Sequence, residues 1–267
     1  MFQSAYQDGD SVDVFSPTGK NPAADWKLTG KVGRLYDKSI KGYVLAVSGG
    51  VTSKMQIPKA PKGTLGLRQR HLVVQLLTAA SQDMPFSLEL GVTDAGGTRR
   101  RLVISSSFRA LHCTPLHAQI PLLGLDNHRG SWANLSVDLA GLMSICFRAD
   151  AFRTLDLLAI GPTCRVRKIF TTKGAIGQQY AEEEDDGVVS DRGENGGIDP
   201  APIQQLPLRM SFPAGVKPPP RTWIISASTL RAFANCDRPG NRLKDSVARV
   251  NSRREVGTRS VASPTPS

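Results

Sequence analysis

The sequence predicts an all-β protein: an antiparallel, jelly-roll-like β-sandwich with one short helix, followed by a largely disordered tail. Up to residue 173, short runs of β-forming residues alternate with Gly, Pro, Asn and Asp, a pattern typical of sandwiches and barrels. One segment, 139–152, has apolar residues at helical spacing instead. After residue 173 the periodicity is lost. We therefore expect a β-sandwich domain over 1–173 and a disordered tail over 174–267.

Each strand is predicted from a short apolar or alternating run that is bounded by turn residues. In chain order, these runs are residues 12–15, 43–47, 54–57, 71–78, 86–93, 100–106, 118–122, 133–139, 155–160 and 165–171. The runs on either side of Asp94-Ala95-Gly96-Gly97 are expected to form a hairpin, because these turn residues tolerate positive φ. The helix is expected over 139–152, where Leu142, Ile145, Cys146 and Ala149 share a face.

Two of the predicted strands carry rows of arginine. In 164–170 a period of two places Cys164 and Val166 on one face and the arginines on the other. In 98–104 it places Leu102 and Ile104 on one face and Arg99 and Arg101, with Val103, on the other. Rows of cations on a rigid sheet are suited to an acidic partner surface. The residues expected to face such a partner are Arg68, Arg70, Arg99, Arg101, Arg165, Arg167 and Lys168.

The charge of the chain also favours acidic partners. The net charge is +11 and the sequence pI is about 9.8, which suits nucleic acid, tubulin or an anionic membrane. The N-terminus lacks the pattern of a signal peptide, and no apolar run approaches the roughly 20 residues that span a bilayer. We therefore expect an intracellular protein without membrane contact, whose four cysteines are reduced and mostly buried.

The tail contains an acidic run, a proline-rich stretch and one apolar island. Residues 182–186 are all Glu or Asp, and such composition cannot repay the entropy of ordering a chain. The island at 221–233 supplies the candidate docking residues Trp223, Ile224, Ile225, Leu230 and Phe233. A partner could order this island as a short helix or an added strand. The island could equally dock on the chain's own domain.

No catalytic pattern is present in the sequence. There is no phosphate-binding G-x-x-x-x-G-K-[ST], no G-x-S-x-G elbow and no H-E-x-x-H. His112 and His117 lie five residues apart, a spacing that suits neither one helix face nor one strand face, and zinc needs three or four converging ligands. We therefore expect no enzymatic activity, no cofactor, no metal and no small-molecule ligand.

Seven sequence pieces, in order, resemble one known family. They are Met1-Phe2-Gln3; Val14-Phe15-Ser16-Pro17-Thr18-Gly19-Lys20-Asn21-Pro22 with Trp26-Lys27; Gln56-Ile57-Pro58-Lys59 with Leu65-Gly66-Leu67; Arg99-Arg100-Arg101-Leu102; Thr114-Pro115-Leu116-His117-Ala118-Gln119-Ile120-Pro121-Leu122; Trp132-Ala133-Asn134-Leu135 with Asp138-Leu139; and Cys164-Arg165-Val166-Arg167-Lys168-Ile169-Phe170-Thr171. On these pieces, residues 1–173 resemble the cilia- and flagella-associated protein 20 family. This chain differs from the founding member by its long tail.

The resemblance implies a β-sandwich that binds tubulin in cilia, as a structural part of the axonemal doublet microtubule and without enzymatic activity. We expect the chain to bind tubulin and other axonemal proteins, at the axoneme or basal body, within the cytoskeleton. The alternative is a nucleic-acid-binding or scaffold protein that uses its basic tail. Aromatic residues make up only 6%, which argues against stacking platforms for single strands and against a sugar-binding sandwich.

Overall fold

The computed structural model describes residues 2, 7–79, 85–122, 129–148, 151–176, 206 and 208–236, with the backbone alone for 232–236. The chain divides into two compact units, 1–230 and 231–267. The first unit holds both sheets and the candidate sites. The described part of the second unit is the last six residues of helix α2 (Ala227–Cys236).

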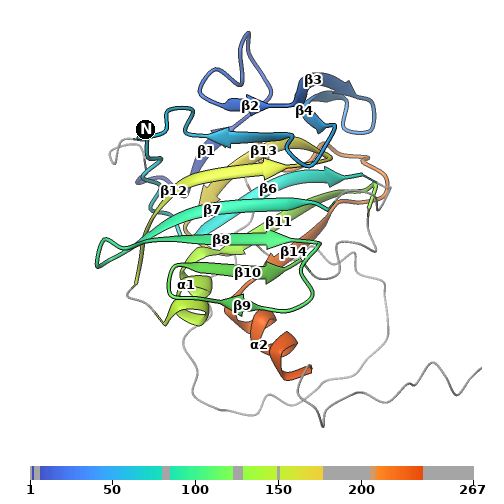
Figure 1. Cartoon of the computed structure of the whole chain (residues 1–267). Coiled ribbons are helices and arrows are strands. Elements are labelled where there is room, and N and C mark those ends of the chain that lie inside the picture. The colour runs from blue at the N-terminus through green and yellow to red at the C-terminus, as the bar shows by residue number, and fades with distance from the viewer. Residues whose placement is uncertain are drawn as a thin grey trace, which may run out of the picture. The chain divides into compact units, whose positions relative to one another are not determined.

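Two sheets form the first unit, with seven strands each (Figure 1). Sheet A has the order β14-β11-β6-β13-β4-β3, and β1 pairs with β13. Its strands are β1 (Ser11–Phe15), β3 (Lys31–Asp37), β4 (Gly42–Ser48), β6 (His71–Thr78), β11 (Trp132–Asp138), β13 (Cys164–Thr172) and β14 (Arg221–Ile225). Sheet B has the order β2-β5-β12-β7-β8-β10-β9. Its strands are β2 (Lys27–Thr29), β5 (Lys54–Ile57), β7 (Ser87–Asp94), β8 (Arg99–Ser105), β9 (His112–Cys113), β10 (His117–Pro121) and β12 (Phe152–Gly161).

The main core lies between the two sheets. Both sheets contribute alternate residues to one apolar cluster, including Val74, Leu135 and Ile169 from sheet A and Leu90, Ile104 and Leu158 from sheet B. Each of these side chains is fully buried, and burial of such a side chain stabilises the fold by about 1.5–3 kcal/mol. The mostly β, two-sheet architecture that the sequence predicted is therefore confirmed.

The β7–β8 hairpin shows why this part of the sequence folds as predicted. Gly97 takes a φ of +84° in the turn, which glycine adopts without a steric cost. The Asp94 carboxylate accepts a hydrogen bond from the backbone N–H of Thr98 at 2.7 Å. It also accepts two hydrogen bonds from Arg100, at 3.1 and 2.8 Å. These bonds hold the two strand ends in register.

Helix α1 (Leu139–Phe147) begins where predicted and ends early. Asp138 is its N-cap and accepts from the backbone N–H of Gly141 at 3.0 Å. The helix stops at Arg148, which is left-handed with a φ of +48°. The predicted helix continued to residue 152, but Phe152 instead begins β12, because that residue pairs with Asp94 of β7.

The ten predicted strands are present, with bounds that shift by a few residues, and four further strands were not predicted. The four are β2, β3, β9 and β14. Charged residues interrupt the apolar alternation of β3, and β9 is only two residues long. The pairing is antiparallel except for β8 with β10 and β11 with β14, which are parallel.

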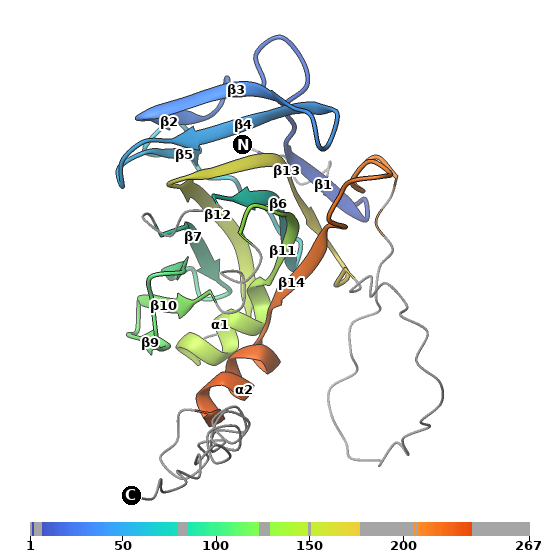
Figure 2. The ribbon, with the colours of Figure 1, turned by 90° about the vertical axis from the view of Figure 1, so that its right-hand side faces the viewer.

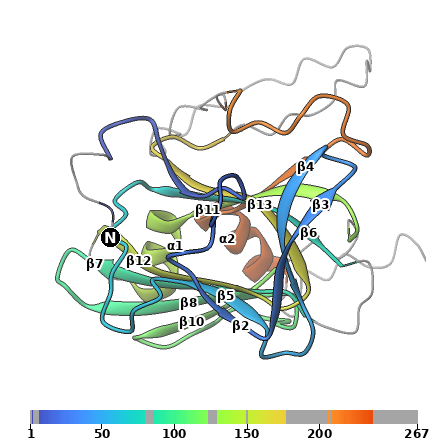
Figure 3. The same cartoon turned by 90° about the horizontal axis from the view of Figure 1, so that it is seen from above.

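A C-terminal segment, of which residues 206 and 208–225 are described, completes sheet A. β13 ends at Thr172, beside the predicted domain end at 173, yet residues up to 230 belong to the same compact unit. β14 lies alongside β11 (Figure 2), and the stretch before it runs over the outer face of sheet A (Figure 3). The acidic run 182–186 lies outside the described residues.

Candidate protein-interaction surfaces

The two predicted arginine rows lie on different sheets. Arg99 and Arg101 belong to β8 of sheet B, while Arg165, Arg167 and Lys168 belong to β13 of sheet A. Arg99, Arg101, Arg165 and Arg167 face away from the core, as the alternation predicted. One flat partner surface therefore cannot contact both rows at once.

The row on sheet B stands on an open outer face. Arg99 is exposed, and Arg101 is half-exposed while its Nε donates to the Glu89 carboxylate at 2.7 Å. His117 of β10 lies next to Arg101 in the parallel register and is also exposed. Gly91 of β7 is half-buried beside this row, and a Cβ added there would lie 3.0 Å from Cβ of Leu157. This face thus presents Arg99, Arg101 and His117 to the solvent.

Arg68 and Arg70 precede β6 and are both exposed. Arg70 forms a two-pronged ion pair with Asp138, with both N···O distances at 2.8 Å. Burial raises the pKa of the Asp138 carboxyl, but hydrogen bonds from Arg70 and Gly141 outweigh it, and the pKa lies below its ordinary value. Because Asp138 also caps α1, Arg70 has a structural task that the sequence did not indicate.

The row on sheet A is occupied by the chain itself. Arg165 pairs with Asp37 at 2.8 Å. A register shift between Val166 and Lys168 puts Arg167 and Lys168 on the same outer face. Arg167 lies 5.2 Å from the ring centre of Phe212, and Lys168 donates to the carbonyl of Arg209 at 2.8 Å. These two predicted partner-binding cations therefore bind the chain's own C-terminal segment.

Gln75 of β6 joins this segment to the sheet. Its amide nitrogen donates to the Asn134 side chain at 3.0 Å and to the Met210 carbonyl at 2.7 Å. Its oxygen accepts from Arg167, and Asn134 in turn donates to Thr222 of β14 at 3.3 Å. The polar chain thus crosses four neighbouring strands beneath the segment.

The predicted docking island packs on the chain's own sandwich. Leu135 of β11 lies opposite Trp223 in the parallel register. Trp223, Ile225 and Leu230 all join the main core, and Ile224 is half-buried. Of the two alternatives that the sequence left open, docking on the chain's own domain is what the structure shows for these residues. The side chain of Phe233 lies outside the described residues.

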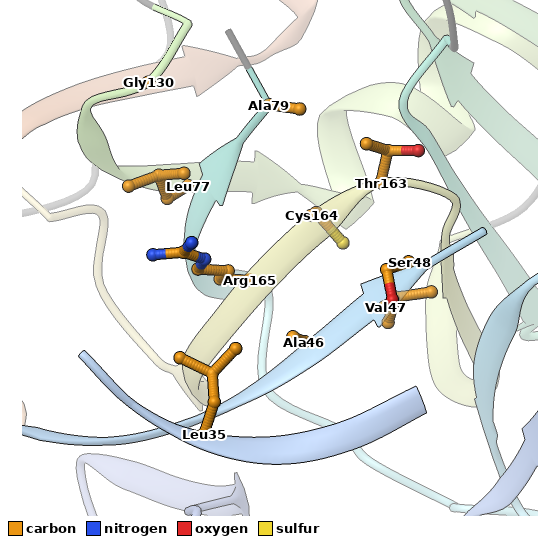
Figure 4. Close-up of a pocket in the computed structure, with 10 residues that line it drawn as sticks. All are labelled: Leu35, Ala46, Val47, Ser48, Leu77, Ala79, Gly130, Thr163, Cys164 and Arg165. Atoms are coloured by element: carbon orange, nitrogen blue, oxygen red, sulfur yellow. The ribbon is translucent and has the colours of Figure 1, made fainter. Parts of the chain in front are cut away.

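A pocket of about 510 Å³ opens beside Arg165 of β13 (Figure 4). Leu35, Ala46 and Leu77 supply apolar walls, and Arg165 lies among them. Asp37 already neutralises that guanidinium. The pocket therefore offers an apolar surface with little net charge.

The β3–β4 hairpin carries exposed aromatic and basic residues that the sequence reasoning missed. Tyr36 and Tyr43 lie opposite each other in the register, and Arg34 lies over the Tyr43 ring at 4.0 Å. The signal was present in the alternation of Arg34 and Tyr36 on either side of Leu35, but the glycine and the charged residues of this strand obscured it.

Within the described ranges, no three His, Cys, Asp or Glu side chains are grouped so as to hold a metal ion. No helix in the described part of the chain is long and apolar enough to cross a membrane.

Comparisons with known proteins give one strong match and several weak ones. The CFA20 domain matches residues 1–188. WD repeat-containing protein 90 of Homo sapiens is 24% identical over 210 residues, which cover 71% of this chain and 11% of that protein. The chain thus spans about a tenth of this relative.

Among solved structures, an exo-β-agarase is 10% identical with a TM-score of 0.33, covering 60% of this chain and 24% of the agarase. A family 35 carbohydrate-binding module of Clostridium thermocellum is 12% identical with a TM-score of 0.25, covering 55% of this chain and 93% of the module. With TM-scores this low, neither likeness bears on function. Because the CFA20 domain covers well over half of the chain, the protein belongs to the family of cilia- and flagella-associated protein 20 and is a cilia-related protein.

Proposed function

We propose that this protein is a non-enzymatic structural component of cilia or flagella that binds tubulin in axonemal or basal-body microtubules. The observation that carries the proposal is the CFA20 domain over residues 1–188. The net charge of +11 supports it, because a strongly basic protein is attracted to acidic surfaces. The binding surface is the outer face of sheet B, with Arg99 and Arg101 at its centre.

The choice of sheet B follows from what covers the other sheet. On sheet A, Arg167 and Lys168 are engaged by residues 209–212. On sheet B, both arginines remain accessible. A single exposed ion pair contributes only about 0–1 kcal/mol, so the arginines act together and mainly set the encounter rate and the salt dependence of binding.

The carboxylates with displaced pKa values support a structural role. Hydrogen bonds from Arg100 hold the pKa of Asp94 below its ordinary value. The pKa of Asp37 is lowered as well, since hydrogen bonds from Ser39 and Arg165 outweigh the effect of burial. Each of these groups is held by an arginine from another strand of its own sheet, Asp94 by Arg100 of β8 and Asp37 by Arg165 of β13, an arrangement that stabilises a fold.

Co-sedimentation of the full chain with stabilised microtubules over a salt series tests the proposal. The variant Arg99→Ser with Arg101→Ser should lose the salt-sensitive pelleting. The matched control, Lys59→Ser with Lys62→Ser, removes the same charge from an exposed loop after β5 and should pellet like the unchanged protein. Equal losses in both variants would show that binding depends on net charge and not on the outer face of sheet B. Failure of the unchanged chain to pellet at low salt would overturn direct binding.

A further inference from the structure

Strand β3 is an edge of sheet A. β4 pairs with it along all seven residues, and among the described residues no strand pairs with its other side. An unpaired edge presents a row of backbone N–H and C=O groups that can accept another strand. The opposite end of the sheet differs, because there the chain's own β14 covers β11.

The β3–β4 hairpin extends past the core. Near its base, Val32 and Leu45 pack in the main core. Nearer the turn, the same face carries Tyr36 and Tyr43 instead, whose exposed fractions are 53% and 49%. Their rings meet edge to face, with centroids 5.5 Å apart and planes at 80°. Rigid, exposed aromatic pairs of this kind give a large contact area at low entropic cost.

Arg34 is held in place on this face. Its guanidinium lies 4.0 Å from the centre of the Tyr43 ring, and Nη1 donates to the carbonyl of Gly19 at 3.1 Å. A guanidinium has five N–H donors, and the described residues take one of them. The group is therefore positioned in advance, with donors left for a carboxylate.

The rest of the hairpin adds positive charge. Lys31, Lys38 and Lys41 are exposed and form no ion pair within the described part of the chain. The hairpin's one carboxylate, Asp37, is buried and bound by Arg165 and Ser39. Lysines on an edge strand also prevent aggregation, but that task needs neither a tyrosine pair nor a guanidinium fixed by two contacts.

We propose that the β3 edge, with Arg34, Tyr36 and Tyr43, is a second interaction site that binds an acidic peptide segment of another protein as an added strand. Main-chain hydrogen bonds to β3 supply affinity, and the tyrosine pair and surrounding cations select an acidic sequence. The site is on sheet A, away from the arginines of β8, and it does not depend on microtubule binding.

The test uses the full chain and a fluorescein-labelled peptide in which Glu alternates with Val. Fluorescence anisotropy should show saturable binding, and hydrogen exchange at residues 31–37 should slow when the peptide is present. The same peptide N-methylated at alternate residues keeps its charge but cannot pair as a strand, and it should bind at least about tenfold more weakly. The variant Tyr36→Ser with Tyr43→Ser should weaken binding to a similar degree.

Two controls separate this site from general charge and from the proposed function. Lys59→Ser with Lys62→Ser should bind the peptide normally. Arg99→Ser with Arg101→Ser should also bind the peptide normally, even if it no longer pellets with microtubules. Equal binding of the N-methylated peptide would overturn strand addition, and unchanged binding by the tyrosine variant would overturn the site. Because both tyrosines are half-exposed, the variant should fold, which thermal unfolding can verify.

Discussion

The amide of Gln75 has three partners on the outer face of sheet A, although the residue is fully buried. Each partner lies on a different element: Asn134 on β11, Arg167 on β13 and the Met210 carbonyl on the C-terminal segment. A buried polar group without a partner is costly. This one side chain therefore links the segment to the sheet at the level of individual hydrogen bonds.

We predict that Gln75→Ala lowers the free energy of unfolding by at least about 2 kcal/mol, because it leaves several buried polar groups unsatisfied. Urea unfolding followed by circular dichroism measures the change. The control is Gln119→Ala on the exposed face of β10, which should stay within about 0.5 kcal/mol of the unchanged protein. Similar effects of the two substitutions would contradict the role given to Gln75.

The Asp138 carboxylate makes stability depend on pH. Its pKa in the folded protein is below the ordinary 3.8, so its contribution is present above pH 3.8 and is lost as the pH falls through the folded pKa. The neighbouring His71 acts in the same direction at higher pH, because burial lowers its pKa from 6.5. Its contribution therefore begins to fall as the pH drops below 6.5 and is lost as the pH falls through the lowered pKa of the folded protein.

We predict that Asp138→Asn flattens the acid side of the stability profile. Asparagine still caps a helix but cannot form the ion pair with Arg70. Between about pH 5 and about pH 2.5 the free energy of unfolding should fall more in the unchanged protein than in the variant. The difference is the stabilisation that the ionised Asp138 carboxylate contributes through its lowered pKa. Denaturant titrations at each pH give both curves. Parallel curves would show that the ion pair contributes nothing measurable.

At the scale of elements, the C-terminal segment acts as part of the sandwich. Met210 packs with Val73 and Phe170, and Val216 packs with Trp132 and Val44, on the outer face of sheet A. Beyond them β14 extends the sheet beside β11. Without this segment, a wide apolar face and a strand edge would meet water.

Ending the chain after residue 205 should therefore destabilise the sandwich by several kcal/mol, since each large buried side chain that is lost removes about 1.5–3 kcal/mol. The truncated protein should also bind a hydrophobic dye such as ANS. A chain that ends after residue 236 keeps the segment and should behave like the full chain. If the shorter chain were as stable as the full one, the packing of the segment would have no energetic weight.

At the scale of the whole molecule, positive charge is spread over both the sandwich and the tail. Residues 1–173 carry 22 basic and 12 acidic side chains, and residues 237–267 carry seven basic and three acidic ones. Either part could attract an acidic partner by charge alone. The family match, however, falls on residues 1–188.

We therefore predict that a chain ending after residue 236 pellets with microtubules over the same salt range as the full chain. Its affinity for nonspecific DNA should fall, because the tail's cations no longer neutralise phosphates. Filter binding with a random duplex measures the second quantity. Loss of microtubule pelleting in the shortened chain would assign the contact to the tail and favour the scaffold alternative.

The sequence alone was sufficient for the fold class, ten of the fourteen strands that the structure describes and the faces on which Arg99, Arg101 and Arg165 lie. All of these depend on local information, since a period of two assigns a side chain to a face whichever strand lies alongside. The start of α1 was equally local, because Asp138 caps it from the preceding residue. The family resemblance rested on contiguous pieces of sequence and was confirmed.

Only the tertiary structure decided which sheet each strand joins and what covers each face. The period of two is the same in β8 and β13, so it could not separate the two arginine rows. Trp223 and Met210 became core residues because sheet A offers them an apolar edge and face that are assembled from strands far apart in the chain. Such contacts depend on long-range pairing, and for that reason Arg167 could be read as a free cation until the segment that covers it was seen.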